Sequence, residues 1–283
     1  MSILVVGKTG QLASHLREEL PEAEYWGRDR LDWTSQQDYV AEIVDYRPQV
    51  IINATAYTAV DLAESEPGIA YRVNALGPAA LAEAAHRCGA TLIHVSTDYV
   101  FNGESAEPYS VSAATRPNTT YGRSKLAGEQ VLAASGAHCL VVRTSWVFSE
   151  FGNNFVKTML SLGQRDALTI VADQRGRPTY AKYLAQTIAT LAAEPSVLAS
   201  GVYHFSGGPA VSWYEFATHI FDQAGHLGLL ERVPILEPVD SSQYPTVARR
   251  PLNSVLAPSM ELMALAPRRD WEQGLSEVLP KIV

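Results

Sequence analysis

SILVVGKTGQLA, residues 2–13, is the stretch of the sequence that decides the fold. The run SILVVG at residues 2–7 is short, branched and apolar and ends in glycine, which is typical of a strand buried in a parallel sheet. Leu12, Leu16 and Leu20 follow at fourfold spacing and predict a helix that begins near Gly10. The sequence thus predicts a buried strand, a glycine turn and a helix in succession.

The same alternation continues through the first half of the chain. Further strands are predicted from short apolar runs at residues 24–27, 50–55, 91–97 and 139–147. Helices are predicted between them, at residues 67–85 and 121–134. Strands that alternate with helices are typical of βαβ units. The predicted fold class is therefore α/β, with a Rossmann-type doubly wound parallel sheet.

The pattern is less regular after about residue 150. Helices are predicted at residues 180–193, 212–224 and 270–279, and a late strand at residues 201–207. Residues 234–258 are rich in proline and are predicted to be mostly loop. We predict a dinucleotide-binding domain over residues 1–150 and a smaller, mainly substrate-binding lobe over residues 151–283. Segments such as residues 201–207 are expected to return to the first domain.

Composition excludes several classes of protein. The chain of 283 residues has 22 Lys and Arg against 30 Asp and Glu, a net charge of −8, which disfavours nucleic acid and anionic membranes as partners. No apolar stretch reaches the roughly 18 residues of a membrane span, and no signal peptide is visible. Cys88 and Cys139 form neither a metal-binding spacing nor a disulfide framework, so we expect a cytoplasmic protein.

The glycine turn predicts a dinucleotide site. Gly7, Gly10 and Ala13 follow the pattern G-x-x-G-x-x-A between the first strand and the first helix. Glycine lets the backbone turn tightly and approach a pyrophosphate, which then lies at the positive end of the helix. Farther along, Arg28 favours a ribose 2′-phosphate and Asp32 a free 2′-hydroxyl. We favour NADPH because of Arg28, and NADH use stays open.

Tyr121 and Lys125 are predicted to form a chemical pair. They are four residues apart, so they share one face of a helix. A nearby ammonium favours the phenolate, which would make Tyr121 a usable acid or base. The alternative is an ordinary surface pair. Thr97 and Asp98 come at the end of a predicted strand, where ligands bind in open α/β sheets, and this favours the chemical interpretation.

This constellation resembles the extended short-chain dehydrogenase/reductase superfamily, and further motifs resemble its dTDP-4-dehydrorhamnose reductase family. The longer motifs are residues 7–12 (GKTGQL), 53–61 (NATAYTAVD), 96–101 (STDYVF), 121–129 (YGRSKLAGE), 143–147 (RTSWV) and 152–155 (GNNF). Shorter ones are Asp173-Gln174, Arg177-Pro178-Thr179, Tyr244-Pro245-Thr246 and Arg249-Arg250-Pro251. They occur in the family's order over nearly the whole chain.

The resemblance implies reduction of the C4 ketone of dTDP-4-dehydro-L-rhamnose to dTDP-L-rhamnose by NADPH or NADH. It implies that Tyr121 is the proton donor, that Thr97 polarises the substrate oxygen and that Lys125 holds the nicotinamide ribose. Cofactor contacts are expected at Gly7, Gly10, Gln11, Leu12, Arg28, Asp32, Trp33, Ala54, Thr55, Ala56, Val95, Tyr121 and Lys125. Substrate contacts are expected at Thr97, Asp98, Tyr99, Trp146, Asn154, Arg249 and Arg250.

Some of these residues have plainer alternatives. Trp146 also suits a buried core aromatic, and Arg249 and Arg250 suit a surface ion pair. Two rival functions share the fold: an epimerase or dehydratase that retains NAD, and a non-catalytic regulatory subunit.

One departure from the family concerns metal. Some members form a dimer through Mg²⁺ held by glutamates, and two matching positions here are His15 and Lys182. Mg²⁺ prefers oxygen ligands. We therefore expect no metal site and no metal-bridged dimer, so the chain is predicted to be a monomer or a homodimer.

Overall fold

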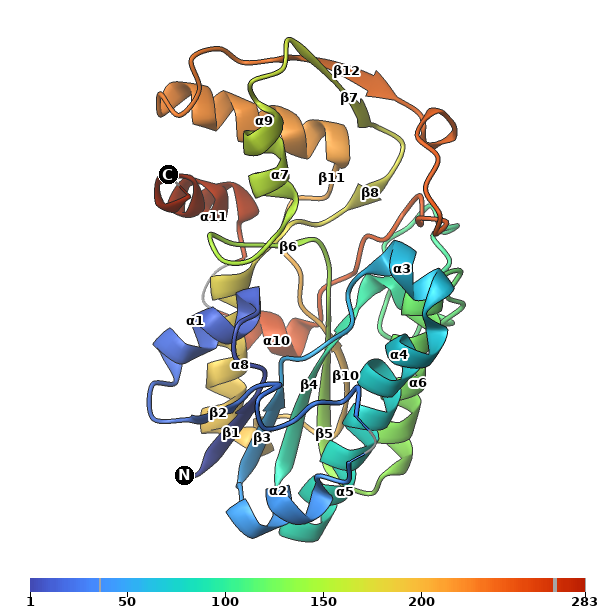
Figure 1. Ribbon diagram of the computed structural model, residues 1–283, viewed down its shortest axis with the longest axis vertical. Coiled ribbons are helices and arrows are strands. Elements are labelled where there is room, and N and C mark those ends of the chain that lie inside the picture. Colours follow the sequence, from blue (N-terminus) through green and yellow to red (C-terminus); the bar gives the residue numbers. More distant parts are fainter. Residues whose placement is uncertain (36, 267–268, 283) are drawn as a thin grey trace.

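A six-stranded parallel sheet forms the base of the molecule (Figure 1). The computed structural model describes residues 1–35, 37–266 and 269–282. The strands lie in the order β10-β5-β4-β3-β1-β2. Their bounds are β1 (Ile3–Val6), β2 (Glu24–Trp26), β3 (Val50–Asn53), β4 (Thr91–Thr97), β5 (His138–Thr144) and β10 (Gly201–His204). The predicted Rossmann-type α/β fold is confirmed.

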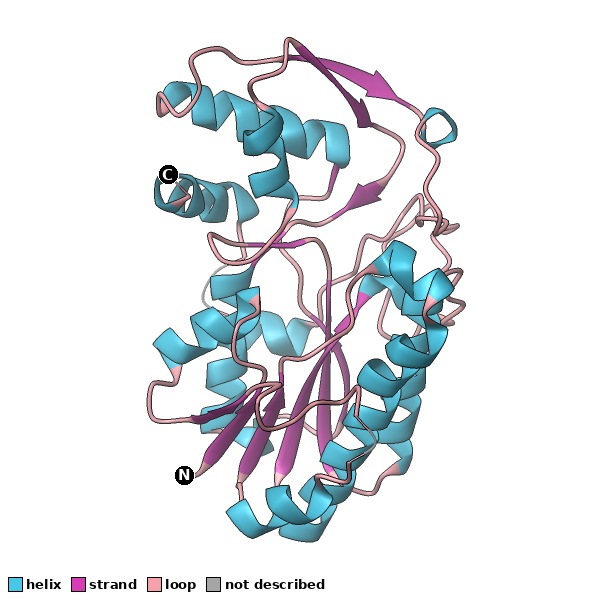
Figure 2. Cartoon of the chain, in the orientation of Figure 1, coloured by secondary structure: helices cyan, strands magenta, loops and turns pink. Residues whose placement is uncertain are grey.

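Helices cover both faces of this sheet (Figure 2), which explains why its strands are apolar on both sides. On one face, Val5 packs with side chains of α1 (Gln11–Glu19) and α8 (Ala181–Ala193). On the other face, Leu4 and Val6 pack with α2 (Val40–Tyr46), α5 (Gly77–Cys88) and α6 (Thr120–Ala134). Each such buried side chain contributes about 1.5–3 kcal/mol relative to an exposed one.

The helix predicted over residues 67–85 is interrupted. It consists of α4 (Pro67–Tyr71), a π-helical turn (Arg72–Leu76) and α5. Pro78 has no N–H, so the carbonyl of Asn74 receives no α-helical hydrogen bond from it. At the same residue, the Asn74 side-chain amide donates to the Tyr57 carbonyl and to Ser124 of α6. The π turn therefore ties this helix to the segment after β3 and to the helix that carries Tyr121.

A smaller lobe lies above the carboxyl ends of the strands (Figure 1). Its helices are α7 (Phe155–Leu162), α9 (Trp213–His226) and α11 (Trp271–Val278). Its short strand pairs are β6 (Val147–Phe148) with β9 (Thr179–Tyr180), β8 (Arg175–Gly176) with β11 (Val211–Ser212), and β7 (Ala167–Val171) with β12 (Ile235–Val239). Two further helices are α3 (Val60–Ser65) and α10 (Met260–Leu265).

Two strand predictions need correction. Residues 234–258 were predicted to be loop, but they contain β12, whose Pro238 is tolerated because β7 is its partner in a two-stranded sheet with open edges. The strand predicted over residues 139–147 ends at Thr144, because Trp146 adopts a left-handed φ of 47°. β10 pairs with β5, so part of the second half of the chain completes the main sheet.

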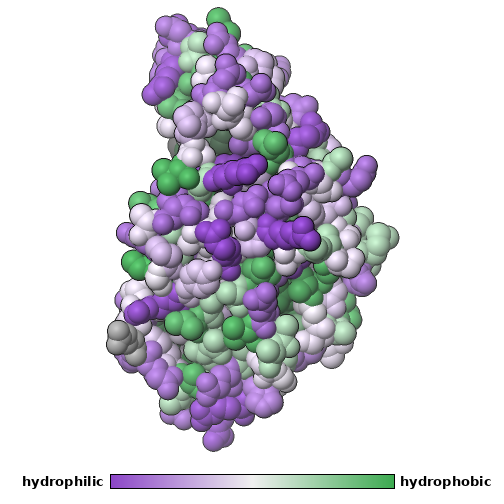
Figure 3. Space-filling model, turned by 90° about the vertical axis from the view of Figure 1, so that its right-hand side faces the viewer, coloured by the Kyte–Doolittle hydropathy of each residue, from purple (hydrophilic) through white to green (hydrophobic). Residues whose placement is uncertain are grey.

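The surface over α3, α4 and α6 is mixed in character. Hydrophilic residues gather across the middle of this face, and hydrophobic residues lie among them below (Figure 3). Exposed hydrophobic side chains on these helices include Leu62, Ile69 and Val131. Among the described residues, no helix is long and apolar enough to cross a membrane.

Candidate active site

A cavity of about 620 Å³ lies between the carboxyl ends of the sheet strands and the smaller lobe. The chain leaves β1 toward β2 on one side and returns to β3 on the other, so the β1/β3 junction is the switch point at which such sheets bind ligands. The predicted residues that line this cavity are Gly10, Gln11, Leu12, Ala54, Thr55, Ala56, Val95, Thr97, Asp98, Tyr99, Tyr121, Lys125 and Trp146.

The turn after β1 forms a cradle for phosphate. Gly7 has φ +121°, and a Cβ there would come within 3.2 Å of Ala54, so glycine is required on both counts. Gly10 is the N-cap of α1 and offers no side chain to cap its free N–H groups. A Cβ added at Gly10 would meet nothing within 4 Å, so space is open at this helix end. Open N–H groups at a helix N-terminus suit a pyrophosphate.

A second cavity of about 550 Å³ continues from this cradle, and it is lined by Gly7, Arg28, Asp32 and Trp33. Asp32 accepts hydrogen bonds from the backbone N–H and the hydroxyl of Thr34, at 2.9 and 2.6 Å. The other acidic residue of the loop, Asp29, is paired with Lys8 at 3.0 Å. Arg28 is exposed and lines the same cavity, where the sequence predicts the adenosine end of the cofactor.

Tyr121 lies at the floor of the first cavity and is buried. It stands in the first turn of α6, which Thr119 caps by accepting from the Gly122 N–H. Thr97 and Tyr121 both line this cavity. Burial, followed by the nearby Asp98 and Tyr99, raises the pKa of Tyr121. The phenol therefore holds its proton at neutral pH, which suits an acid.

The structure places the amino group of Lys125 against β4. Lys125 Nζ donates to the Val95 carbonyl at 2.7 Å and lies 3.1 Å from His94 Nε2. Burial lowers the pKa of Lys125 to about 8. The expectation that Lys125 favours the Tyr121 phenolate stays a prediction.

Asp98 is also buried beside Thr97. The Thr97 hydroxyl donates to Asp98 Oδ1 at 3.0 Å. Burial raises the pKa of Asp98 to about 6, although hydrogen bonds from Ser254 and Thr97 lower it. At pH 7 most of this carboxyl is ionised, which leaves it an acceptor for hydroxyl groups.

Two stacked tryptophans form a wall of the first cavity. The rings of Trp146 and Trp213 are 3.4 Å apart and nearly parallel at 5°. Trp146 is half-buried and lines the cavity, so it is not a wholly buried core residue. Trp213 also lines a third cavity of about 560 Å³, together with Tyr99, Phe155, Gln174, Tyr244 and Arg250. The tryptophan pair therefore separates two adjoining spaces of the same cleft.

A family model described as RmlD substrate binding domain matches residues 1–283. This chain belongs to that family. The dTDP-4-dehydrorhamnose reductase of Aggregatibacter actinomycetemcomitans is 42% identical over 98% of this chain and 97% of its own length. A solved structure of the reductase from Clostridium acetobutylicum has a TM-score of 0.90 at 36% identity and covers 99% of both chains.

A further solved structure in the RmlD family bears on the cofactor. It is a dTDP-4-dehydrorhamnose reductase from Bacillus anthracis in complex with NADP, with a TM-score of 0.88 at 35% identity. It covers 99% of this chain and 100% of that one. The resemblance inferred from the sequence motifs is thus confirmed.

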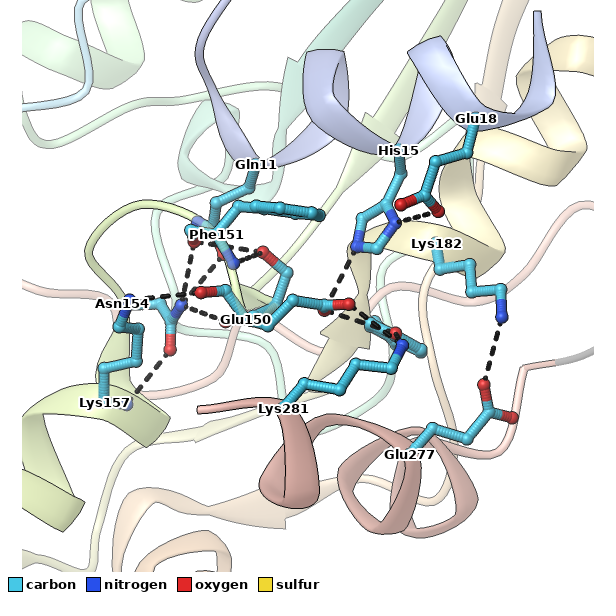
Figure 4. Close-up of polar contacts among 12 residues, drawn as sticks. Gln11, His15, Glu18, Glu150, Phe151, Asn154, Lys157, Lys182, Glu277 and Lys281 are labelled. Carbon is cyan, nitrogen blue, oxygen red and sulfur yellow. Dashed lines mark hydrogen bonds and ion pairs between the residues drawn. The ribbon is translucent and has the colours of Figure 1, made fainter. Parts of the chain in front are cut away.

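Asn154 lies beside Gln11 and above the start of α7 (Figure 4). Its amide nitrogen donates to the Ser149 carbonyl at 2.7 Å and to Gln11 Oε1 at 3.1 Å. Its oxygen accepts from the Lys157 N–H and so caps α7. These contacts fix the loop beside Gln11, in which Gly152 and Asn153 line the cavity. The substrate contact expected for Asn154 stays a prediction.

The side chains of Arg249 and Arg250 make different contacts. Arg250 donates to Asp61 at 2.6 Å and to the Tyr99 hydroxyl at 3.3 Å, and it lines the third cavity. Arg249 is exposed and lines a fourth hollow, with Asp173 and Arg175, which Arg250 also borders. The geometry therefore favours Arg250 over Arg249 as a contact for a substrate phosphate.

His15 of α1 and Lys182 of α8 lie among charged residues (Figure 4). His15 Nε2 is 3.3 Å from Glu150, whose other oxygen accepts from Lys281 at 2.9 Å. Lys182 is 3.4 Å from Glu277. Within residues 1–35, 37–266 and 269–282, no group of three or more His, Cys, Asp or Glu side chains is arranged to hold a metal.

Two residues of the cleft were missed from the sequence. Trp213 was hidden at the start of a helix, although the Ser212–Glu215 capping box next to it was visible and is present. His94 was overlooked because it lies inside the apolar strand TLIHVST. The signal that could have identified it is the presence of a titratable residue in a strand that is buried on both faces.

Proposed function

We propose that this protein reduces the C4 ketone of dTDP-4-dehydro-L-rhamnose to dTDP-L-rhamnose and uses NADPH as reductant. The observation that carries the proposal is that Thr97, Tyr121 and Lys125 line one large cleft together with Gly10 of the phosphate cradle. Membership of the family and full-length reductase relatives at 42% identity support the same activity.

The cofactor fits the cavities of this chain. The open N-terminus of α1 would receive the pyrophosphate, and the cavity at Arg28, Asp32 and Trp33 would receive the adenosine end. Arg28 supports NADPH, because a guanidinium forms paired hydrogen bonds with phosphate oxygens. Bound there, NADPH supplies the hydride for the ketone carbon.

Tyr121 supplies the proton. As the ketone carbon is reduced, its oxygen becomes an alkoxide, which the Thr97 hydroxyl and the Tyr121 phenol stabilise by hydrogen bonding. The phenolic proton then passes to that oxygen and leaves a phenolate. The raised pKa of Tyr121 keeps the proton in place until the alkoxide forms.

The third cavity supports a nucleotide-sugar substrate. Its lining combines aromatic side chains such as Phe155 and Tyr244 with Gln174 and Arg250. Aromatic walls suit a planar base, amide groups suit its hydrogen-bonding edge, and arginine suits a diphosphate. The sugar would then extend past the Trp146–Trp213 pair toward Tyr121.

A turnover assay tests the proposal. The purified protein is expected to oxidise NADPH only when dTDP-4-dehydro-L-rhamnose is added, with dTDP-L-rhamnose as product. Absence of turnover with both NADPH and NADH would favour a non-catalytic subunit. Stoichiometric NAD⁺ that survives desalting would favour an epimerase or dehydratase.

We further propose that assembly, as a monomer or a homodimer, does not depend on Mg²⁺. The ammonium groups of Lys182 and Lys281 lie against Glu277 and Glu150, where they neutralise carboxylates that a metal would need. The molar mass measured by light scattering is expected to be the same in EDTA and in excess Mg²⁺. A change of mass between the two conditions would contradict this.

A cytoplasmic location is part of the same proposal. Cys88 and Cys139 are both free thiols, which suits a reducing compartment.

A further inference from the structure

A continuous line of polar contacts runs from the segment after β3 to α6 beneath the cleft. The backbone N–H and the hydroxyl of Thr55 donate to Asn53 Oδ1, at 3.0 and 2.7 Å. Asn53 Nδ2 is 3.0 Å from His94 Nδ1, and His94 Nε2 is 3.1 Å from Lys125 Nζ. Asn53 and His94 are 0% exposed and Lys125 is 1% exposed, so water does not share these contacts.

The two ends of this line fix the direction of every hydrogen bond in it. A backbone N–H only donates, so the Asn53 atom facing Thr55 is the carbonyl oxygen and the atom facing His94 is the NH₂ group. An NH₂ group only donates, so His94 Nδ1 accepts. The proton of the neutral imidazole is then on Nε2.

The His94 Nε2–H therefore points at Lys125 Nζ. A lysine ammonium has three donors and no acceptor, so it makes no hydrogen bond with this N–H. A neutral amine has a lone pair that accepts from His94 while one of its own N–H groups donates to the Val95 carbonyl. Every member of the line is satisfied only when Lys125 is neutral.

We propose that His94 is a positioning residue that stabilises the neutral amine of Lys125 in the cofactor-free protein, and that binding of NADPH stabilises the ammonium, so that each molecule whose Lys125 is neutral takes up one proton. The hydrogen bond from His94 Nε2 to Lys125 Nζ breaks, Nζ gains a proton from solvent, and a ribose hydroxyl of the cofactor becomes a new acceptor. The proposal rests on NADPH being the cofactor. In the alternative, Lys125 is an ammonium both with and without the cofactor, and no proton is taken up on binding.

The charges around Lys125 are consistent with this. Burial lowers its pKa to about 8, against the effect of Glu129, and burial followed by Lys125 holds the pKa of His94 well below its usual value. Glu129 on the same helix is already engaged by Arg143 of β5 at 2.6 Å. The other titratable groups in the described lining of the cleft are Tyr121 of α6 and Asp98 and Tyr99 after β4.

The sign of the pH dependence follows. Because binding requires a proton, NADPH affinity is full below the pKa of about 8 of the free lysine and falls as the pH rises above it. The fall approaches about tenfold per pH unit until the pKa of the bound state is reached.

Titration calorimetry in buffers of different ionisation enthalpy counts the protons taken up. The wild-type protein is expected to take up about one proton per NADPH near pH 9 and well under half a proton near pH 7.5. No uptake at either pH would overturn the proposal. Absence of NADPH binding under any condition would instead refute the proposed function, and the proposal with it.

Two variants distinguish the effect of His94 on the protonation of Lys125 from the effect of burial alone. In Asn53→Asp, the carboxylate accepts from both Thr55 and His94 Nδ1–H, so His94 Nε2 presents a lone pair to an ammonium and proton uptake is expected to vanish. His94→Phe removes the opposing N–H without adding charge, and uptake is expected to decrease. Uptake that is unchanged in both folded variants would show that burial alone sets the protonation of Lys125.

The cofactor-free wild-type protein gives a direct reading that needs no variant to fold. In a protein labelled with ¹³C and ¹⁵N, NMR distinguishes the two neutral tautomers of His94, whose ring signals are assigned through their couplings to its own backbone. The Nε2–H tautomer is expected. The Nδ1–H tautomer would overturn the proposal.

Discussion

Replacing Tyr121 with phenylalanine is expected to lower kcat by about 10²–10⁴-fold, the usual contribution of a positioned general acid. The change removes the phenolic proton but leaves the ring, which packs edge-on against Tyr99 at 5.5 Å. The Kd for NADPH measured by fluorescence titration is expected to stay close to that of the wild type.

Tyr99→Phe is the matched control for this variant. Its hydroxyl accepts from Arg250 at 3.3 Å, on the substrate side of the cleft. Its loss is expected to raise KM with a smaller change in kcat, because the proton donor remains. Near wild-type kcat in Tyr121→Phe would show that another group supplies the proton.

The first half of the fold was predictable because most of its strands are buried on both faces. Such strands give uninterrupted apolar runs, as in Ile3–Val6 and Val50–Asn53. β12 was missed because its burial is slight and Pro238 interrupts it. The π turn at Arg72–Leu76 was missed because a proline inside a helical pattern does not reveal how the hydrogen bonding of the preceding turn changes.

Site residues were predictable where their position depends on a single segment of the sequence. Thr97 and Tyr121 line the same cavity, since both belong to segments whose geometry the parallel sheet fixes. The direction in which Lys125 points was not predictable, because it depends on His94 and Val95, which lie on another element. The contacts of Asn154 with Gln11 and Ser149 were not predictable for a similar reason, because these residues come together only in the folded chain.

A buried ion pair behind the site joins the elements that carry it. Arg143 of β5 donates to Glu129 of α6 at 2.6 and 2.9 Å, and Ser96 of β4 donates to the same carboxylate at 2.5 Å. His204 of β10 lies 3.3 Å from Arg143 Nη1. Burial, followed by the Arg143 charge, lowers the pKa of His204 to about 4, so it is neutral at pH 7 and accepts from the guanidinium.

Glu129→Leu is therefore expected to lower the free energy of unfolding by about 3–5 kcal/mol, because it leaves the guanidinium of Arg143 buried without its counter-charge. Arg143→Met is expected to cost a similar amount by leaving Glu129 unpaired. The double variant removes both charges and is expected to be more stable than either single variant, since no desolvated charge remains. Urea denaturation of the four proteins measures this cycle. If the two single costs simply add in the double variant, the pair does not act as a unit and the four elements are held together by apolar packing alone.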